Sequence, residues 1–261
     1  MTGAAAQREH LFIGWDVGGW NCDKNQNSRD ALVVLDHAGQ SPGQPWRGNL
    51  RETINSASTP ADFLAALLAL CKLANPSQSC HATLAIDAPL GFPGAFARMI
   101  AGGAPVDQIG RSAANPYLFR HTERRLVAEG VTPLSAIKDM IGSQATKAMH
   151  LVARFAPQRL SPGVWTDGTH LTVIETYPAL CRARLGPQVG AEPIPKTGRE
   201  ADIHDAEVCA RIARDFHLNR ERLEPPTDDT PPSEGWIWAP LSTTNDKVHN
   251  ERDRSLLPQR P

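Results

Sequence analysis

Two aspartates stand at the polar ends of apolar segments, where a carboxylate could do chemistry. Asp16 follows the apolar run 11–15, and Asp87 follows the apolar run 83–86. A carboxylate in such a place is costly to bury alone, so each is expected to have a partner or to face a cleft. Side by side in one sheet, the two would concentrate negative charge that Mg²⁺ or Mn²⁺ neutralises. The pattern therefore predicts a divalent metal site at Asp16 and Asp87.

Two further acids extend this pattern into the C-terminal half. Glu175 lies in a Glu-Thr-Tyr-Pro segment, and Asp205 lies in a helix-like segment. We predict that Asp16, Asp87 and Asp205 bind the metal and that Glu175 joins them as a catalytic residue. Glu175 could instead be a structural acid that pairs with Arg182 or with a backbone amide. Asp205 could equally be one of the surface acids that helices carry routinely.

Basic side chains are concentrated in the middle of the chain, where they could serve an anionic substrate. Nine basic and four acidic residues lie between positions 91 and 160. Arg120 and Arg124 are four apart and could grip a phosphate group from one helical face. We predict substrate contacts from Arg120, Arg124 and Lys138. Two alternatives stay open, because Glu123 or Glu129 could neutralise the two arginines and a solvated helical face has the same composition.

The composition favours a large globular unit with many turns. Of the 261 residues, 41% are hydrophobic, 22 are proline and 20 are glycine. That length allows a real core, and the proline and glycine content argues against a helical bundle. The formal net charge of −1 gives no bulk attraction to nucleic acid. The five cysteines include no Cys-x-x-Cys pair, so neither a disulfide framework nor a zinc site is indicated.

The N-terminus and the hydropathy pattern bear on where the protein works. The first ten residues lack the apolar core of a signal peptide, and no apolar run reaches membrane-spanning length. We therefore predict a cytoplasmic protein without a membrane partner. The sequence leaves the oligomeric state open.

The elements that would position these residues alternate between strands and helices. Apolar runs predict strands at 11–17, 31–36, 46–54, 83–87 and 171–176, and a short edge strand at 234–240. Capping and periodicity predict a helix that starts at 60, is carried by the apolar run 63–70 and is ended by the Asn-Pro pair at 75–76, and further helices at 136–154, 179–185 and 200–216. Residues 241–261 are polar and free of aromatic side chains, which predicts a disordered tail.

Three strands, a helix, a strand, further helices, a strand and a final helix is close to the order of elements in the ribonuclease H fold. We therefore predict an α/β protein: a ribonuclease H-like, mixed five-stranded sheet flanked by helices. Residues 1–240 would form one domain, with a helical insertion at about 92–165 after the fourth strand. That fold places acids on its first strand, on its fourth strand and on its last helix, which are the positions of Asp16, Asp87 and Asp205.

Five short blocks carry a more specific resemblance. They are Gly14-Trp15-Asp16, Ile86-Asp87-Ala88-Pro89-Leu90-Gly91, Phe119-Arg120-His121-Thr122-Glu123, Glu175-Thr176-Tyr177-Pro178 and His204-Asp205-Ala206-Glu207. This set resembles the domain-of-unknown-function 429 family, a group of predicted nucleases with a ribonuclease H-like fold, over residues 11 to about 216. The last helix of such proteins often reads Asp-Ala-x-x-Ala. Here Cys209 stands at the second alanine, which leaves the last metal ligand open.

Three functions remain in view. The resemblance implies a Mg²⁺- or Mn²⁺-dependent phosphodiester hydrolase, a nuclease with nucleic acid as its substrate. The segment 16–19, Asp-Val-Gly-Gly, also resembles the first phosphate loop of actin-like and sugar-kinase phosphotransferases. Such proteins need a second Asp-x-Gly loop, and the one at 167–169 follows the wrong element. The third alternative is a binding module that keeps the fold and lacks catalysis.

Overall fold

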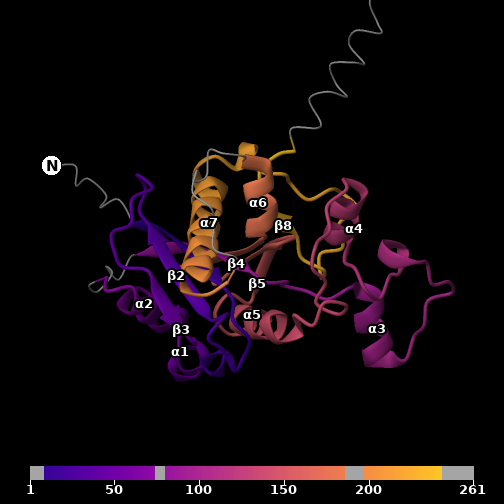
Figure 1. The fold of residues 1–261 in the computed structure, drawn as a ribbon, viewed down its shortest axis with the longest axis horizontal. Coiled ribbons are helices and arrows are strands. Elements are labelled where there is room, and N and C mark those ends of the chain that lie inside the picture. The colour runs from indigo at the N-terminus through magenta and orange to yellow at the C-terminus, as the bar shows by residue number, and fades with distance from the viewer. Residues whose placement is uncertain (1–8, 74–79, 186–196, 243–261) are drawn as a thin grey trace, which may run out of the picture.

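A computed structural model describes residues 9–73, 80–185 and 197–242 of the chain. Its eight strands form one sheet (Figure 1), with the order β3-β2-β1-β4-β7-β6-β5 and with β8 pairing with β7. The strands are β1 (His10–Asp16), β2 (Asp30–Leu35), β3 (Trp46–Gly48), β4 (His81–Asp87), β5 (Gln158–Ser161), β6 (Val164–Thr166), β7 (Leu171–Thr176) and β8 (Ile237–Trp238). The fold is therefore α/β with a mixed sheet, as predicted at that level.

The central strands are the apolar runs of the sequence. β1 and β4 bury every residue between their first and last positions, as expected of strands covered on both faces. β4 runs parallel to β1 and to β7, whereas β2 runs antiparallel to β1. The carboxyl ends of β1, β4 and β7 consequently meet at one edge of the sheet.

Seven α-helices occur in the described ranges. They are α1 (Arg51–Ser56), α2 (Pro60–Leu70), α3 (Gly94–Gly102), α4 (His121–Ala128), α5 (Gly142–Phe155), α6 (Pro178–Leu185) and α7 (Arg199–Leu218). The start of α2 follows its predicted cap. Thr59 accepts a hydrogen bond from the Asp62 amide, Asp62 accepts one from the Thr59 amide, and Pro60 takes the first helical position.

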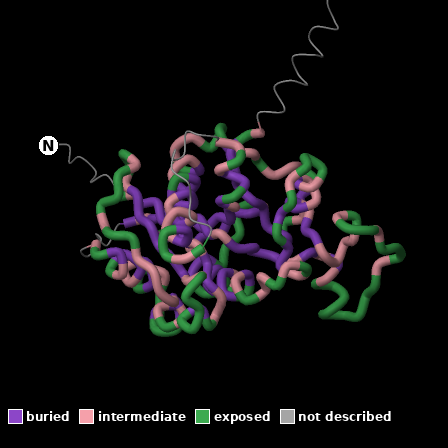
Figure 2. Tube along the Cα trace, viewed as in Figure 1, coloured by how far each residue is buried: buried purple, intermediate pink, exposed green. Residues whose placement is uncertain are grey.

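The helices cover the two faces of the sheet and give it two hydrophobic cores. In the view of Figure 1, α6 and α7 lie above the sheet, and α1, α2 and α5 lie below it. The lower core joins β1 and β4 to α2 and α5, where the rings of Phe63 and Phe155 stack at 4.4 Å. The upper core joins the sheet to α6 and α7. Figure 2 shows this buried interior between exposed loops.

Helix α7 lies directly against β1 because Gly14 has no side chain. A Cβ atom at Gly14 would stand 1.8 Å from the carbonyl oxygen of Ala206 and 2.3 Å from the amide of Ala210. This close approach fixes where the first turns of α7 lie relative to the carboxyl end of β1.

Several predicted boundaries are wrong. The sheet has eight strands: besides the five of the predicted central sheet it contains β5 and β6, which were not predicted, and β8, which lies within the short edge strand predicted at 234–240. The predicted strand 46–54 ends at Gly48, and α1 begins at Arg51. Helix α5 begins at Gly142, six residues after the predicted start. The insertion after β4 holds α3, α4 and α5, and it also contains the β5–β6 hairpin.

Two remaining expectations concern the ends of the chain and its hydropathy. Of the predicted disordered tail 241–261, residues 243–261 lie outside the described residues. Within the described ranges, none of the helices combines the length and the apolar character needed to span a membrane.

Candidate active site

Asp16 and Asp87 lie side by side at the edge where the parallel strands end. They are register partners in the β1–β4 pairing, so their Cα atoms face each other across adjacent strands. Both line a pocket of about 190 Å³ that also reaches the end of β7. In open α/β sheets, ligands bind in the crevice beyond the carboxyl ends of the strands. The structure thus brings together the first two predicted site residues.

Burial and neighbouring acids make both carboxyl groups costly to ionise. Burial, followed by the charges of Asp87 and Asp205, raises the pKa of Asp16 well above its usual range. Burial and the charge of Asp205 raise the pKa of Asp87 to about 8. Neither side chain has a hydrogen bond or an ion pair with a residue of the described chain. The charge of Arg182 only partly offsets that of Asp87. Two acids held together without an ion pair have the electrostatics of a site whose charge an external cation would offset.

Asp205 approaches this pair but is held by an arginine. It lies on α7, and its charge contributes to the raised pKa of both Asp16 and Asp87. Its carboxylate forms an ion pair with Arg182 of α6. Asp202, one turn earlier, pairs instead with Arg47 at 2.6 Å. This ion pair uses Oδ1 of Asp205, so Asp205 could join a metal site through its second carboxylate oxygen or after the ion pair opens.

Glu175 takes the structural role that the sequence left as an alternative. Its side chain is 2% exposed and forms a two-pronged ion pair with Arg120, at 2.6 and 2.8 Å. Its Oε2 also accepts a hydrogen bond from the Leu90 amide at 2.8 Å. The partner is Arg120 rather than the predicted Arg182. Glu175 lines the pocket, but it is already paired inside the fold with Arg120, which also pairs with Glu123.

The predicted phosphate grip by Arg120 and Arg124 does not form. Arg120 is 1% exposed, and its guanidinium donates to Glu123, to Glu175 and to the carbonyl oxygen of Glu234. Arg124 donates instead to the carbonyl oxygen of Phe119 at 3.1 Å. Arg120 is the residue immediately before α4, and its side chain is buried in the core, whereas Arg124 lies within the helix. This difference in position explains why the two guanidinium groups have different partners.

Lys138, the third predicted substrate contact, lies outside the pocket lining. Its Nζ is 3.4 Å from Asp139 and 5.5 Å from the centre of the Phe119 ring. Its side chain is 47% exposed. None of the three predicted basic residues therefore supplies an unpaired side chain to the pocket.

The insertion supplies a wall of the pocket that the sequence did not predict. Pro133, Leu134, Ile141 and Gln144 line it from that side, and Tyr177 lines it from the end of β7. Tyr177 stands two residues after Glu175 in a block that was singled out, so it could have been found. Gln144 and Leu134 carry no such signal, because nothing local in the sequence ties them to the strands β1, β4 and β7.

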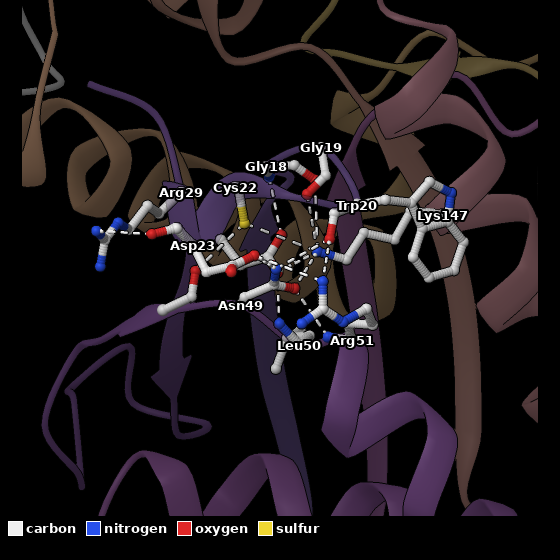
Figure 3. Close-up of polar contacts among 12 residues, drawn as sticks. Gly18, Gly19, Trp20, Cys22, Asp23, Arg29, Asn49, Leu50, Arg51 and Lys147 are labelled. Carbon is white, nitrogen blue, oxygen red and sulfur yellow. Dashed lines mark hydrogen bonds and ion pairs between the residues drawn. The ribbon is translucent and has the colours of Figure 1, made fainter. Parts of the chain in front are cut away.

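A buried ion pair fixes the loop that follows Asp16 (Figure 3). Lys147 of α5 and Asp30 of β2 are both fully buried and form an ion pair. Asp30 also accepts hydrogen bonds from the Gly18 amide at 2.8 Å and from the Trp15 indole at 3.1 Å. Lys147 donates in addition to Asn49 at 3.0 Å. A buried carboxylate with this many donors is held in one place.

Helix α5 also contacts the tip of this loop. The Trp20 amide donates to Ser143 Oγ at 2.9 Å, and the Trp20 indole donates to Thr146 Oγ1 at 3.1 Å. The Lys147 ammonium lies 3.5 Å from the carbonyl oxygens of Gly18 and Gly19. The insertion thus holds the segment that directly follows Asp16.

The donor set for a metal is incomplete in this arrangement. Among the described residues, no group of three or more histidine, cysteine, aspartate or glutamate side chains is placed to hold a metal ion. Asp16 and Asp87 fit a hard cation in donor type and in charge. They supply two side chains, and Arg182 occupies the third predicted ligand, Asp205.

Comparisons with protein-family models, with curated proteins and with solved structures gave no match to this chain. The resemblance to the domain-of-unknown-function 429 family therefore stays a prediction.

Proposed function

We propose that this protein is a metal-dependent phosphodiester hydrolase, a nuclease, with Asp16 and Asp87 as the residues that bind the metal. The supporting observation is their pairing in register at the carboxyl ends of β1 and β4, inside a pocket and without an ion pair to a basic residue of the described chain. Two carboxylates with raised pKa values are stable in such proximity only as acids or beside a cation.

The arrangement of the sheet supports this proposal. The five strands predicted from the sequence are β1, β2, β3, β4 and β7, and they lie in the order β3-β2-β1-β4-β7. Helix α7 crosses β1 and carries Asp205 to the same edge. This is the placement of acids that the ribonuclease H-like interpretation expects, and we propose that fold for the chain.

Each residue of the site would have a distinct part in hydrolysis. A bound divalent cation supplies an activated water and offsets the charge of the phosphate. Asp16 and Asp87 would bind and orient it. Tyr177 would donate a hydrogen bond, because burial and the charge of Asp87 raise its pKa and keep the phenol protonated. Arg182 would neutralise Asp205 in the resting site.

The phosphotransferase alternative has less support. A phosphate loop needs free backbone amides that point at the ligand. Here the Gly18 amide donates to Asp30 and the Trp20 amide donates to Ser143. The amide of Gly18, within the loop, and that of Trp20, next to it, are thus already hydrogen-bonded to protein side chains and are not free to bind a phosphate group.

The decisive experiment is titration of the purified protein with Mn²⁺, followed by calorimetry, for the wild type, Asp16→Asn and Asp87→Asn. We expect binding to the wild type and a loss of affinity of at least about tenfold in each variant, since each removes one of two charged ligands. Asp107→Asn is the matched control, because Asp107 is exposed and lies outside the pocket lining.

Hydrolysis of bis(p-nitrophenyl) phosphate with Mn²⁺ provides the second readout. The wild type and Asp107→Asn should cleave it, and both site variants should not. Metal binding without hydrolysis of this or any nucleic acid would favour the binding-module alternative. Absence of Mn²⁺ binding to the wild type would refute the proposal.

A further inference from the structure

We propose that the pocket beside Asp16 and Asp87 binds one unstacked nucleobase, so that the substrate is single-stranded nucleic acid. This inference rests on the proposed phosphodiester hydrolysis and names the substrate class of the same site. It depends on three properties of the pocket: its size, the chemistry of its walls and its charge.

The size of the pocket suits a single ring. Its volume is about 190 Å³, which is below the range of roughly 300–1,000 Å³ found for drug-sized ligands. Asp16 and Asp87 line the same pocket, so the group next to the scissile phosphate must enter it. A base that is paired inside a duplex cannot enter such a space without leaving the stack.

The residues that line the pocket form an apolar slot with a polar edge. Pro89, Leu134 and Ile141 give it aliphatic surface, and Leu134 is 50% exposed, so it is available for contact. Gln144 and Ser28 also line it, and their side chains have no hydrogen bond with a residue of the described chain. Proteins that select single strands commonly cover the faces of a base and hydrogen-bond to its edge.

The charge of the pocket favours a neutral group. Its acids are Asp16, Asp87 and Glu175, and Arg120 is the basic residue among its lining residues. Arg120 is fully engaged by Glu123, Glu175 and a backbone carbonyl. Away from the metal proposed at Asp16 and Asp87, an anionic group finds no unpaired basic side chain in the lining, whereas an uncharged base can occupy that part of the slot. The phosphate would stay at the mouth, beside Asp16 and Asp87.

The test compares three labelled substrates with the wild-type protein and Mn²⁺. They are a 12-nucleotide single strand, the same strand in a blunt duplex, and the same strand with one tetrahydrofuran abasic site. We expect the single strand to be cleaved at least about tenfold faster than the duplex, because the duplex must first be unstacked. We also expect the product cut at the abasic position to be lost.

Gln144→Ala tests the edge of the base directly, with Gln158→Ala as its control. Gln158 is an exposed glutamine of β5, outside the pocket lining. Gln144→Ala should raise the KM for the single strand about three- to tenfold, with a smaller effect on kcat, since it removes binding rather than chemistry. Gln158→Ala should leave both constants unchanged.

The outcomes separate this inference from the function on which it rests. Equal cleavage of single strand and duplex, an undiminished cut at the abasic position, or no change in KM in Gln144→Ala would each overturn the base pocket. In those cases hydrolysis of bis(p-nitrophenyl) phosphate would still support the nuclease. Failure to hydrolyse any substrate and to bind Mn²⁺ would instead overturn the proposed function.

Discussion

The acids at the carboxyl edge of the sheet differ in whether the fold gives each of them a cation. Glu175 has Arg120, Asp205 has Arg182, and Asp30 has Lys147. Asp16 and Asp87 form no ion pair within the described chain, and their pKa values are raised although the charge of Arg182 partly offsets that of Asp87. A buried pair is costly to break once it is formed. The paired acids are therefore held as structure, and the unpaired ones are free to bind a ligand.

The raised pKa of Asp87 predicts how stability depends on pH in the metal-free protein. The folded pKa is about 8 and the ordinary value is 3.8. Between these pH values Asp87 is protonated in the native state and ionised in the unfolded state. The free energy of unfolding therefore falls as the pH rises from about 4 toward 8. Asp87→Asn cannot ionise, so its stability should exceed that of the wild type at pH 9 by more than about 1 kcal/mol.

Urea unfolding at pH 5, 7 and 9 in the presence of a chelator measures this difference. The gap between Asp87→Asn and the wild type should widen as the pH rises. Asp107→Asn, at an exposed position, should follow the wild type at all three values. A gap that stays constant or narrows with pH would show that Asp87 is not held in its acid form.

At the scale of elements, two contacts place the site: α7 against β1, and α5 against the loop that follows Asp16. The first depends on Gly14, where any side chain would meet the backbone of α7. The second depends on Lys147, which reaches Asp30 and the Gly18 and Gly19 carbonyl oxygens. Both contacts join segments that are more than 100 residues apart in the sequence.

The contact between α7 and β1 predicts that Gly14→Ala is strongly destabilising. The added Cβ would lie 1.8 Å from Ala206 O, so helix and strand must separate, at a cost of about 1–3 kcal/mol or more. Gly102→Ala is the matched control, since Gly102 ends α3 and a Cβ there meets nothing within 4 Å. That variant should be neutral or stabilised by up to about 1 kcal/mol. Thermal and urea unfolding of both variants measure the effect, and equal stabilities would contradict the close approach.

At the scale of the molecule, one sheet separates two hydrophobic cores. Trp15 belongs to the lower core and Trp238 to the upper one, and both are buried. Because β1 and β4 contribute residues to both cores, loss of either core should disrupt the other. This sharing is the physical basis for treating the described elements as one unit.

The shared sheet predicts a single cooperative unfolding transition. Trp15→Phe and Trp238→Phe variants, each followed by tryptophan fluorescence and by far-ultraviolet circular dichroism, should give coincident urea transitions within each variant. Each variant keeps five of the six tryptophans, among them Trp165 in the lower core and Trp236 in the upper one, so its fluorescence reports on both cores. Transitions that separate by probe, or a fluorescence transition in two steps, would contradict the single domain predicted for residues 1–240.

The sequence predicted the central strands better than the edges of the fold. The runs that end at Asp16 and Asp87 are buried on both faces, so their apolar character is continuous and easy to recognise. β3 is three residues long and β8 is two. Such short strands are defined by their partners rather than by their own residues, so the segment after Gly48 was predicted to be strand although it forms α1.

Local pattern alone determined that Asp16 and Asp87 stand at the ends of two strands, because strand ends follow from runs of apolar residues. Only the tertiary structure decided which acids acquire a cation. Arg120 reaches Glu175 across 55 positions and Lys147 reaches Asp30 across 117, and no spacing along the chain encodes such pairs. Charge neutralisation acts through space over a few ångströms. The fold thus left the Asp16–Asp87 pair, of all the acids at this edge, open to a ligand.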